Sequence, residues 1–208
     1  MTAIEEIPLT SPDETVQPVN SLNIGCGRDI RQGWVNLDRF DGPGVDVVAD
    51  LETEPLPFPG DHFDELYMSH VIEHISNVLP MMEELYRVAK PGAELVIRCP
   101  HGSSDDADED PTHVRRMFHG SFLAFAQPYF WRADYGYRGD WSTQRVQLMV
   151  SEKLHKGKSH QVMFERIQSR RNQVIEMVAS LRAVKPRRAQ DYSLFEQCEV
   201  GIQPVKVG

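Results

Sequence analysis

The sequence has few cysteines and no long hydrophobic run. Its three cysteines, Cys26, Cys99 and Cys198, are far apart and odd in number. That pattern argues against a disulfide framework or a zinc ribbon, and it is typical of a reducing compartment. No apolar run approaches the ~18 residues that a membrane-spanning helix needs. Residues 1–20 have neither a basic start nor an apolar stretch, so no secretory signal is expected there. These absences predict a cytoplasmic protein with no membrane partner.

Charge is unevenly distributed along the chain. The 208 residues carry a net charge of −9, and 40% of them are hydrophobic, which is enough for one domain with a sizeable core. Residues 151–190 hold ten basic and three acidic side chains, a net +7, so the rest of the chain carries −16. We expect a flexible arm over residues 1–18, rich in Pro, Thr and Glu, and a single domain over 19–208. A basic helical insertion is expected at about 156–190.

Hydrophobic patterning predicts alternating strands and helices. Strands are expected at 21–24, 34–38, 45–50, 63–69, 93–99 and 143–154, with a last strand near the carboxyl end. Helices are expected at 70–76, at 78–90 and, from a stripe of apolar residues at helical spacing, over 160–184. This order indicates an α/β fold with a mostly parallel, seven-stranded sheet and an antiparallel edge strand. The connections over 25–34 and 39–45 are too short for full helices. We therefore expect the 160–184 helix, from this chain or a second copy, to cover the exposed sheet face.

A glycine turn and several acids follow the first three predicted strands. "LNIGCG" (22–27) places Gly25 and Gly27 directly after a buried strand, where the absence of a Cβ lets the backbone turn sharply and approach a ligand. "VNLD" (35–38) ends the second strand on Asp38, and Asp50 ends the third. Because parallel strands present their carboxyl ends at one edge of a sheet, these residues are expected to meet there. When such residues stand alone, they can equally form a tight turn and cap strand ends.

From residue 22 to about 125 the chain resembles the class I S-adenosylmethionine-dependent methyltransferases, in particular the type 11-like group. The resemblance rests on four features in the family's order: "LNIGCG", "VNLD", "ADLETEPLPFPGDHFDELYMSHVIEH" and "ELYRVAKPGAELVIRCP". It implies a Rossmann-like three-layer sandwich with shortened first helices. It is a poor match to a nicotinamide-dependent dehydrogenase, because the third glycine of that fingerprint is missing.

The resemblance implies S-adenosylmethionine as the cofactor and S-adenosylhomocysteine as its product. The positions that match the family's cofactor-binding residues are Asn23, Gly25, Cys26, Gly27, Asp38, Asp50, Leu51 and Ser69. Asp38 would accept hydrogen bonds from the ribose hydroxyls, and Asp50 with Leu51 would contact the adenine. The chain departs from a common family pattern at two positions, where Asn23 replaces an acid and Asp29 replaces a third glycine.

Histidines cluster where the substrate is expected to enter. His70, Glu73 and His74 are spaced to share one helix face, and His101 ends the fifth predicted strand. His70 and His101 are the candidate catalytic residues, as a base or a substrate contact. Imidazoles and a carboxylate that converge can also hold a divalent metal, as some related methyltransferases do, but we assign no metal ligand from the sequence. In the alternative, Glu73 and His74 only shape the cleft.

The sequence leaves the methyl acceptor open. A small-molecule or carbohydrate-like substrate, methylated on O or N, is the first expectation. The basic 151–190 segment makes nucleic acid a possible partner, although positive charges can also pair with acids of the same chain. A homodimer, or a binding protein without catalysis, is a further alternative. The aromatic stretch 128–141 is expected either to form part of a substrate lid or to pack an insertion onto the sheet.

Overall fold

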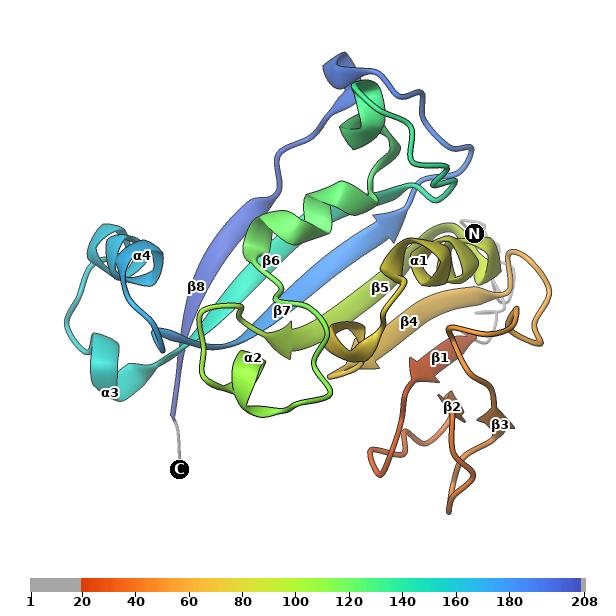
Figure 1. Cartoon of the computed structure of the whole chain (residues 1–208), viewed down its shortest axis with the longest axis horizontal. Coiled ribbons are helices and arrows are strands. Elements are labelled where there is room, and N and C mark those ends of the chain that lie inside the picture. The colour runs from red at the N-terminus through yellow and green to blue at the C-terminus, as the bar shows by residue number, and fades with distance from the viewer. Residues whose placement is uncertain (1–19, 207–208) are drawn as a thin grey trace, which may run out of the picture.

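The structure is a computed structural model that describes residues 20–206, so the predicted arm at 1–18 lies outside the described residues. One mixed sheet dominates the fold (Figure 1). Its eight strands lie in the order β3-β2-β1-β4-β5-β7-β6-β8. Their bounds are Ser21–Ile24 (β1), Val35–Asp38 (β2), Val47–Val48 (β3), Phe63–Ser69 (β4), Ala89–Pro100 (β5), Trp141–Ser151 (β6), Val174–Ala183 (β7) and Glu199–Val205 (β8).

The α/β class predicted from the sequence is confirmed, with differences in the strands. Strands β1 to β5 are mutually parallel, and β7 pairs antiparallel with both β5 and β6. The sheet has eight strands rather than seven, because residues 174–183, predicted as part of a helix, form β7. The predicted last strand is β8, which pairs in parallel with β6. The antiparallel strand therefore lies inside the sheet and not at its edge. The strands predicted at 21–24 and 63–69 match β1 and β4.

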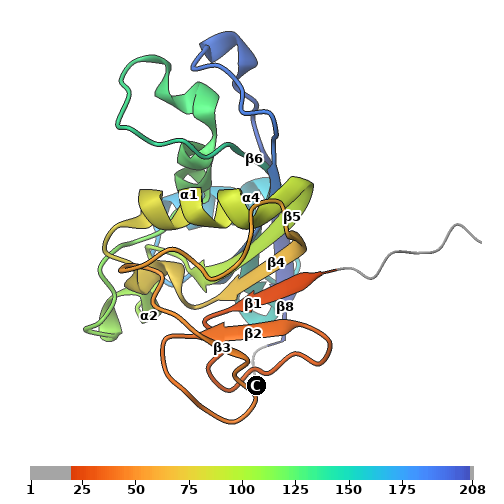
Figure 2. The ribbon, with the colours of Figure 1, turned by 90° about the vertical axis from the view of Figure 1, so that its right-hand side faces the viewer.

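Helices are short and lie mainly beside one face of the sheet. The α-helices are Val78–Val88 (α1), Asp106–Glu109 (α2), Glu152–His155 (α3) and His160–Ser169 (α4). The 3-10 helices are Ile72–His74 (η1), His119–Phe125 (η2), Gln127–Trp131 (η3) and Tyr192–Leu194 (η4). Figure 2 shows α1 on one side of the central strands, with no described helix over their opposite side. The core therefore lies between the sheet and the layer that holds α1 and η2.

Alternation along β4 and β5 explains this one-sided core. Leu66 and Met68 of β4 and Ile97 of β5 are buried toward the helical layer. On the opposite face, Glu65 is exposed and Tyr67 is half-buried. Strand residues alternate between the two faces of a sheet, so burying one set leaves the other set on the open face. The polar character of that open set lets the face remain without a covering helix.

The prediction of one long helix over residues 160–184 is wrong. Only α4, from His160 to Ser169, is helical, and residues from Val174 onward form β7. Within β7 the buried residues follow a period of two, over Met177, Ala179, Leu181 and Ala183. The helix ends because the backbone of Arg170 is extended, with φ −136° and ψ 148°, and Asn172 then turns with a φ of +56° just before β7. The basic segment at 156–190 is therefore part helix and part central strand. It cannot supply the predicted helical cover of the sheet.

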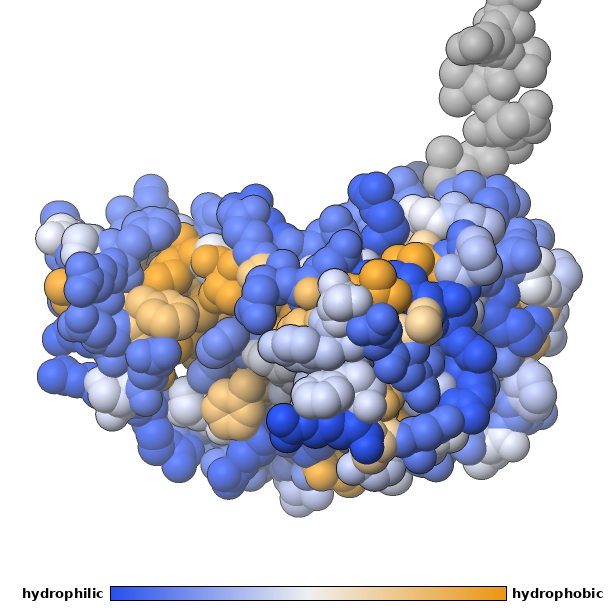
Figure 3. Space-filling model, turned by 90° about the horizontal axis from the view of Figure 1, so that it is seen from above, coloured by the Kyte–Doolittle hydropathy of each residue, from blue (hydrophilic) through white to orange (hydrophobic). Residues whose placement is uncertain are grey.

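The first crossover contains no helix, as the short spacing predicted. Between β1 and β2 the chain forms turns, and the guanidinium of Arg31 lies 3.3 Å from the ring centroid of Tyr67. A single cation–π contact thus covers part of the open face where a helix would otherwise pack. No helix in the described residues is long and apolar enough to cross a membrane. Seen from above, the largely hydrophilic surface carries several separate hydrophobic patches (Figure 3).

Candidate functional site

A cavity of about 410 Å³ opens at the carboxyl ends of the first four strands. This volume lies within the ~300–1,000 Å³ typical of small-molecule sites. Four segments form its wall: the turn after β1, the ends of β2 and β3, and η1. The lining residues are Gly25, Leu37, Asp38, Arg39, Phe40, Ala49, Asp50, Leu51, Glu52, His70, Val71, His74, Ile75 and Thr112. We call this the first cavity. Its position at strand carboxyl ends is where ligands bind in open parallel sheets.

Gly25 shapes the wall of the first cavity. Its φ is +62°, and a Cβ on this residue would lie 2.3 Å from Cγ2 of Val71. The glycine turn is therefore packed directly against the residue that follows the end of β4. Any side chain at position 25 would both strain the backbone and fill the space between the turn and Val71.

Two carboxylates face the first cavity from neighbouring strand ends. Asp38 accepts hydrogen bonds from the backbone N–H groups of Gly27, at 2.8 Å, and Phe40, at 3.0 Å, one on each oxygen. Asp50 accepts from the backbone N–H of Glu52 at 3.0 Å and from Arg39 at 3.2 Å. Each carboxylate oxygen retains a second lone pair for a ligand. Both side chains are thus fixed in place as acceptors.

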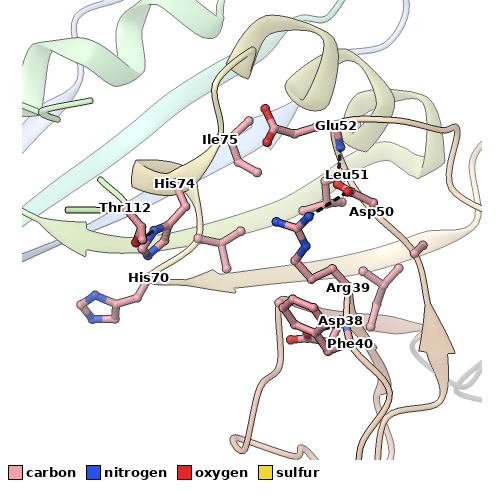
Figure 4. A pocket seen from close by; sticks show the side chains of 14 residues that line it. Asp38, Arg39, Phe40, Asp50, Leu51, Glu52, His70, His74, Ile75 and Thr112 are labelled. Carbon is pink, nitrogen blue, oxygen red and sulfur yellow. Dashed lines mark hydrogen bonds and ion pairs between the residues drawn. The ribbon is translucent and has the colours of Figure 1, made fainter. Parts of the chain in front are cut away.

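Sequence reasoning missed several residues of the first cavity. Arg39, Phe40 and Glu52 come from the turns that follow the acids at the ends of β2 and β3. Phe40 is 70% exposed, and an aromatic residue two positions after the candidate ligand-binding Asp38 was a signal available in the sequence. Figure 4 shows Arg39 joined to Asp50 on one side of the cavity and His74 beside Thr112 on the other.

Four of the predicted cofactor residues, Asn23, Cys26, Gly27 and Ser69, do not line the first cavity. Asn23 is buried, and its amide donates to the carbonyl of Asp29 at 2.7 Å, which holds the turn closed. Cys26 is also buried, and its N–H donates to Leu37. The other four, Gly25, Asp38, Asp50 and Leu51, all line the cavity. Packing thus decides which residues of the glycine turn face the cavity.

His70 lies at the boundary of the site and has an unusual backbone. Its φ is +54°, which is rare for a residue other than glycine and often accompanies a functional position. Nε2 lies 2.9 Å from Glu176 and Nδ1 lies 3.3 Å from Glu73. The hydrogen bond to Glu176, aided by the Glu73 carboxylate, raises the pKa of His70 to about 10. Glu176 also binds the Arg98 guanidinium.

A second cavity of about 530 Å³ adjoins the first one. The two cavities share His70 and His74. Four carboxylates and one further histidine line the second cavity, and its residues are His70, His74, Pro100, Asp106, Glu109, Asp110, His113, Ile175 and Glu176. This acidic lining attracts cations and repels polyanions.

His101, the other predicted catalytic histidine, is in a different environment. Its side chain is buried and lines neither cavity, and Nδ1 lies 2.8 Å from Oγ of Ser103. Burial, together with the nearby His119, lowers the pKa of His101 to about 4. The structure therefore brings His70 to both cavities and keeps His101 neutral behind the wall.

Several basic residues of the 151–190 segment pair with acids of the same chain. Arg171 lies 2.8 Å from Asp105, and Lys185 lies 2.5 Å from Asp61. Arg188 binds the buried Asp140 at 2.8 Å. These pairs neutralise part of the +7 segment with the acidic remainder of the domain. The aromatic residues that surround η3 line a separate cavity that shares no residue with the first or second one.

Comparison with known proteins finds methyltransferases. Residues 22–97 match the family model of the methyltransferase domain. The chain is 33% identical over 76 residues to a ubiquinone/menaquinone biosynthesis C-methyltransferase of Coxiella burnetii, covering 36% of this chain and 27% of that protein. It is 23% identical over 129 residues to a sterol 4-C-methyltransferase of Caenorhabditis elegans, covering 51% of this chain and 38% of that protein. Over residues 22–97 the chain is thus similar to the class I S-adenosylmethionine-dependent methyltransferase family.

Solved structures agree on the fold. A S-adenosylmethionine-dependent methyltransferase from Archaeoglobus fulgidus aligns over 80% of this chain and 86% of its own, with a TM-score of 0.56 and 19% identity. The [4+2]-cyclase SpnF aligns over 80% of this chain and 74% of its own, with a TM-score of 0.53 and 14% identity. The chain spans about a quarter to two fifths of the length of its curated relatives. These likenesses therefore define the fold and leave the acceptor to the site itself.

S-adenosylmethionine is the cofactor of this family, and the first cavity fits it. Because position 25 has no Cβ, the glycine turn packs closely against Val71, and both residues line the cavity. Asp38 and Asp50 offer fixed acceptors with unused lone pairs, which suits a ligand with ribose hydroxyls and an amino-substituted base. The apolar side chains Leu37, Leu51 and Ile75 complete the wall.

Proposed function

We propose that this chain transfers a methyl group from S-adenosylmethionine in the first cavity to a small molecule in the second. The observation that carries this proposal is that the two cavities meet at His70 and His74. When bound, S-adenosylmethionine supplies a methyl group activated by its sulfonium. Asp38 and Asp50 hold the donor, and the wall at His70 and His74 marks the point of transfer. Such in-line displacement depends mainly on positioning.

We propose an oxygen or nitrogen of a neutral or cationic small molecule as the acceptor. Support comes from the four carboxylates of the second cavity, which disfavour a polyanion such as nucleic acid. On transfer, the methyl–sulfur bond breaks, a bond to the acceptor atom forms, and the acceptor loses its proton to a nearby base. Carboxylates that line the second cavity, such as Glu109 and Asp110, can take this proton.

A carbon acceptor is the second candidate. It is favoured by the curated relatives, which are described as C-methyltransferases of a quinone pathway and of a sterol. Those matches cover a minority of each relative. Position-specific analysis of the methylated product separates carbon from oxygen or nitrogen. The three unpaired cysteines support a proposed cytoplasmic location.

The donor role is tested by calorimetry with S-adenosylmethionine on the full chain. Replacing Asp38 with Ala should weaken binding at least tenfold, because a charged acceptor for the ligand is lost. Asp41→Ala is the matched control, since it removes the same charge from an exposed position in the same turn. Equal affinities of the two variants would contradict the assigned role, provided that both unfold at the wild-type temperature.

The acceptor class is tested with methyl-labelled cofactor and pooled cell metabolites and nucleic acids. We expect the label in the small-molecule fraction. Label in nucleic acid would overturn the acceptor assignment. Donor binding without any label transfer would favour a binding protein without catalysis.

A further inference from the structure

Three metal-binding side chains converge at the wall of the second cavity. Glu73 and His74 come from η1, and His113 comes from the loop that precedes η2. One ligand atom from each lies within 4.8 Å of the other two. Three ligand atoms about 2.1 Å from a shared ion and equally spaced around it are at most about 3.6 Å apart. Each side chain would therefore have to move inward by about 0.7 Å at most to close the set around an ion.

Hydrogen bonds fix the tautomer of His74. The Thr112 hydroxyl donates to Oδ1 of Asp110 at 2.6 Å, so toward His74 its oxygen acts as an acceptor. Nδ1 of His74, at 2.9 Å from that oxygen, must then carry the proton. The lone pair of the ring is left on Nε2. A carboxylate that orients an imidazole through such a contact is typical of metal-binding histidines.

His113 is oriented in the same way by a different partner. Its Nδ1 lies 3.3 Å from the carbonyl oxygen of Ala107, which can only accept, so Nδ1 carries the proton. Nε2 lies 4.0 Å from Asp110, beyond hydrogen-bonding distance, and keeps its lone pair. The N–H of Val114 donates to the carbonyl of Glu73 at 2.9 Å, which ties the loop that carries His113 to η1.

Glu73 is the independent sign that this cluster has an open ligand position. It is 2% exposed, and neither of its carboxylate oxygens has a hydrogen-bond partner in the described residues. Oε1 forms an ion pair with Nδ1 of His70 at 3.3 Å. Oε2 makes no such contact in the described residues, and a buried carboxylate oxygen normally has a partner, which a bound ion would supply.

We infer that Glu73, His74 and His113 bind a divalent transition-metal ion such as Zn²⁺. Two imidazoles with one carboxylate form a known ligand set for zinc and for non-haem iron, whereas Mg²⁺ and Ca²⁺ prefer all-oxygen sites. The remaining coordination positions face the second cavity, which His74 and His113 both line. If the proposed methyl transfer holds, the ion would bind the acceptor there and make its hydroxyl more acidic.

The inference is tested on the full chain, stripped with a chelator and titrated with ZnCl₂ in a calorimeter. We expect one ion per chain, and a visible absorption band when Co²⁺ replaces Zn²⁺. His113→Ala should weaken Zn²⁺ binding at least 100-fold, and Thr112→Val should weaken it about 10- to 100-fold through the lost orientation of His74. His160→Ala, at an exposed position on α4, is the matched control and should bind as the wild type does.

Glu73→Gln separates a metal ligand from a structural group. It keeps the shape of the side chain but removes the charge that a metal ligand needs, and it should abolish tight Zn²⁺ binding. It also breaks the ion pair with His70, so the folded fraction of the metal-free variant is measured first by circular dichroism. Zn²⁺ binding that is unchanged in folded Glu73→Gln and His113→Ala would overturn the inference.

The same samples distinguish this inference from the proposed function. S-adenosylmethionine binding is measured in the presence of chelator, where His113→Ala should have no effect, because His113 does not line the first cavity. Zn²⁺ binding without S-adenosylmethionine binding would sink only the methyltransferase proposal. The reverse result would sink only the metal site.

Discussion

The two cavities that meet at His70 and His74 are built in opposite ways. In the first cavity, Asp38 and Asp50 are held by backbone N–H groups and remain available as acceptors. Beside the second cavity, Glu73 is buried with no hydrogen-bond partner among residues 20–206, and His113 keeps the lone pair of Nε2. A site of satisfied acceptors suits an organic ligand rich in donors. A site of unsatisfied ligand atoms suits a cation. Adjacent cavities of this kind can hold a donor and an acceptor in separate but touching sites.

The largest effect is expected from Gly25→Ala. The new Cβ would meet Val71 at 2.3 Å in a backbone with φ of +62°, so S-adenosylmethionine affinity should fall about 100-fold or more, a change of roughly 3 kcal/mol. Gly27→Ala is the control, since its Cβ would meet nothing within 4 Å and only the backbone strain remains. Calorimetry measures both variants. Zn²⁺ binding should survive Gly25→Ala, and its loss would show that the cavities are not independent.

The pH dependence of folding should reveal the buried His101. Burial lowers its pKa from 6.5 to about 4, so the unfolded chain takes up a proton between these values while the folded chain does not. Its contribution to stability is full above pH 6.5 and declines as pH falls toward 4, by about 3 kcal/mol in all. Urea unfolding at pH 7 and pH 4.5 measures this loss. In His101→Gln the loss should shrink; an equal loss in both proteins would exclude His101 as its source.

A smaller effect is expected from Asp50→Asn. The substitution keeps an oxygen that accepts the hydrogen bond from the Glu52 N–H, but it removes the negative charge that pairs with Arg39. The affinity for S-adenosylmethionine should therefore fall about tenfold. Asp41→Asn serves as the control. If the affinity of the Asp50→Asn variant is unchanged, the adenine base of the cofactor does not contact Asp50.

The smallest effect is expected in the basic segment. Arg171→Gln breaks an exposed pair with Asp105 and should cost less than about 1 kcal/mol of unfolding free energy. The wild type should show no salt-dependent binding to random oligonucleotides, because its acidic second cavity disfavours phosphate. A steep salt dependence that Arg171→Gln reduces would revive nucleic acid as the substrate.

The sequence could predict what depends on local pattern. The β1 and β4 strands, the glycine turn and Asp38 followed from periodicity and from the family's motif order, and the clipped crossover followed from spacing. The strand β7 was not predicted. Val174, Val178 and Leu181 have the spacing of one face of a helix, whereas the residues that are buried in β7 mostly occur at every second position. Only the neighbouring strands β5 and β6 decide between the two patterns.

The proposed metal-binding cluster likewise could be predicted only in part from local sequence pattern. His70, Glu73 and His74 were recognisable from their spacing on one short helix. Thr112 and His113 join them only because a loop 38 residues further along the chain folds back onto His74. The orientation of both imidazoles depends on those tertiary contacts, so no local pattern contains it.

The most direct test of the account is a crystal structure of the chain grown with S-adenosylhomocysteine and ZnCl₂. We predict the nucleoside of the ligand in the first cavity, with its ribose hydroxyls on Asp38, and one ion on Glu73, His74 and His113 across the shared wall. A ligand bound away from Asp38, or an ion held by other residues, would contradict the pairing of an organic donor site with a cationic acceptor site.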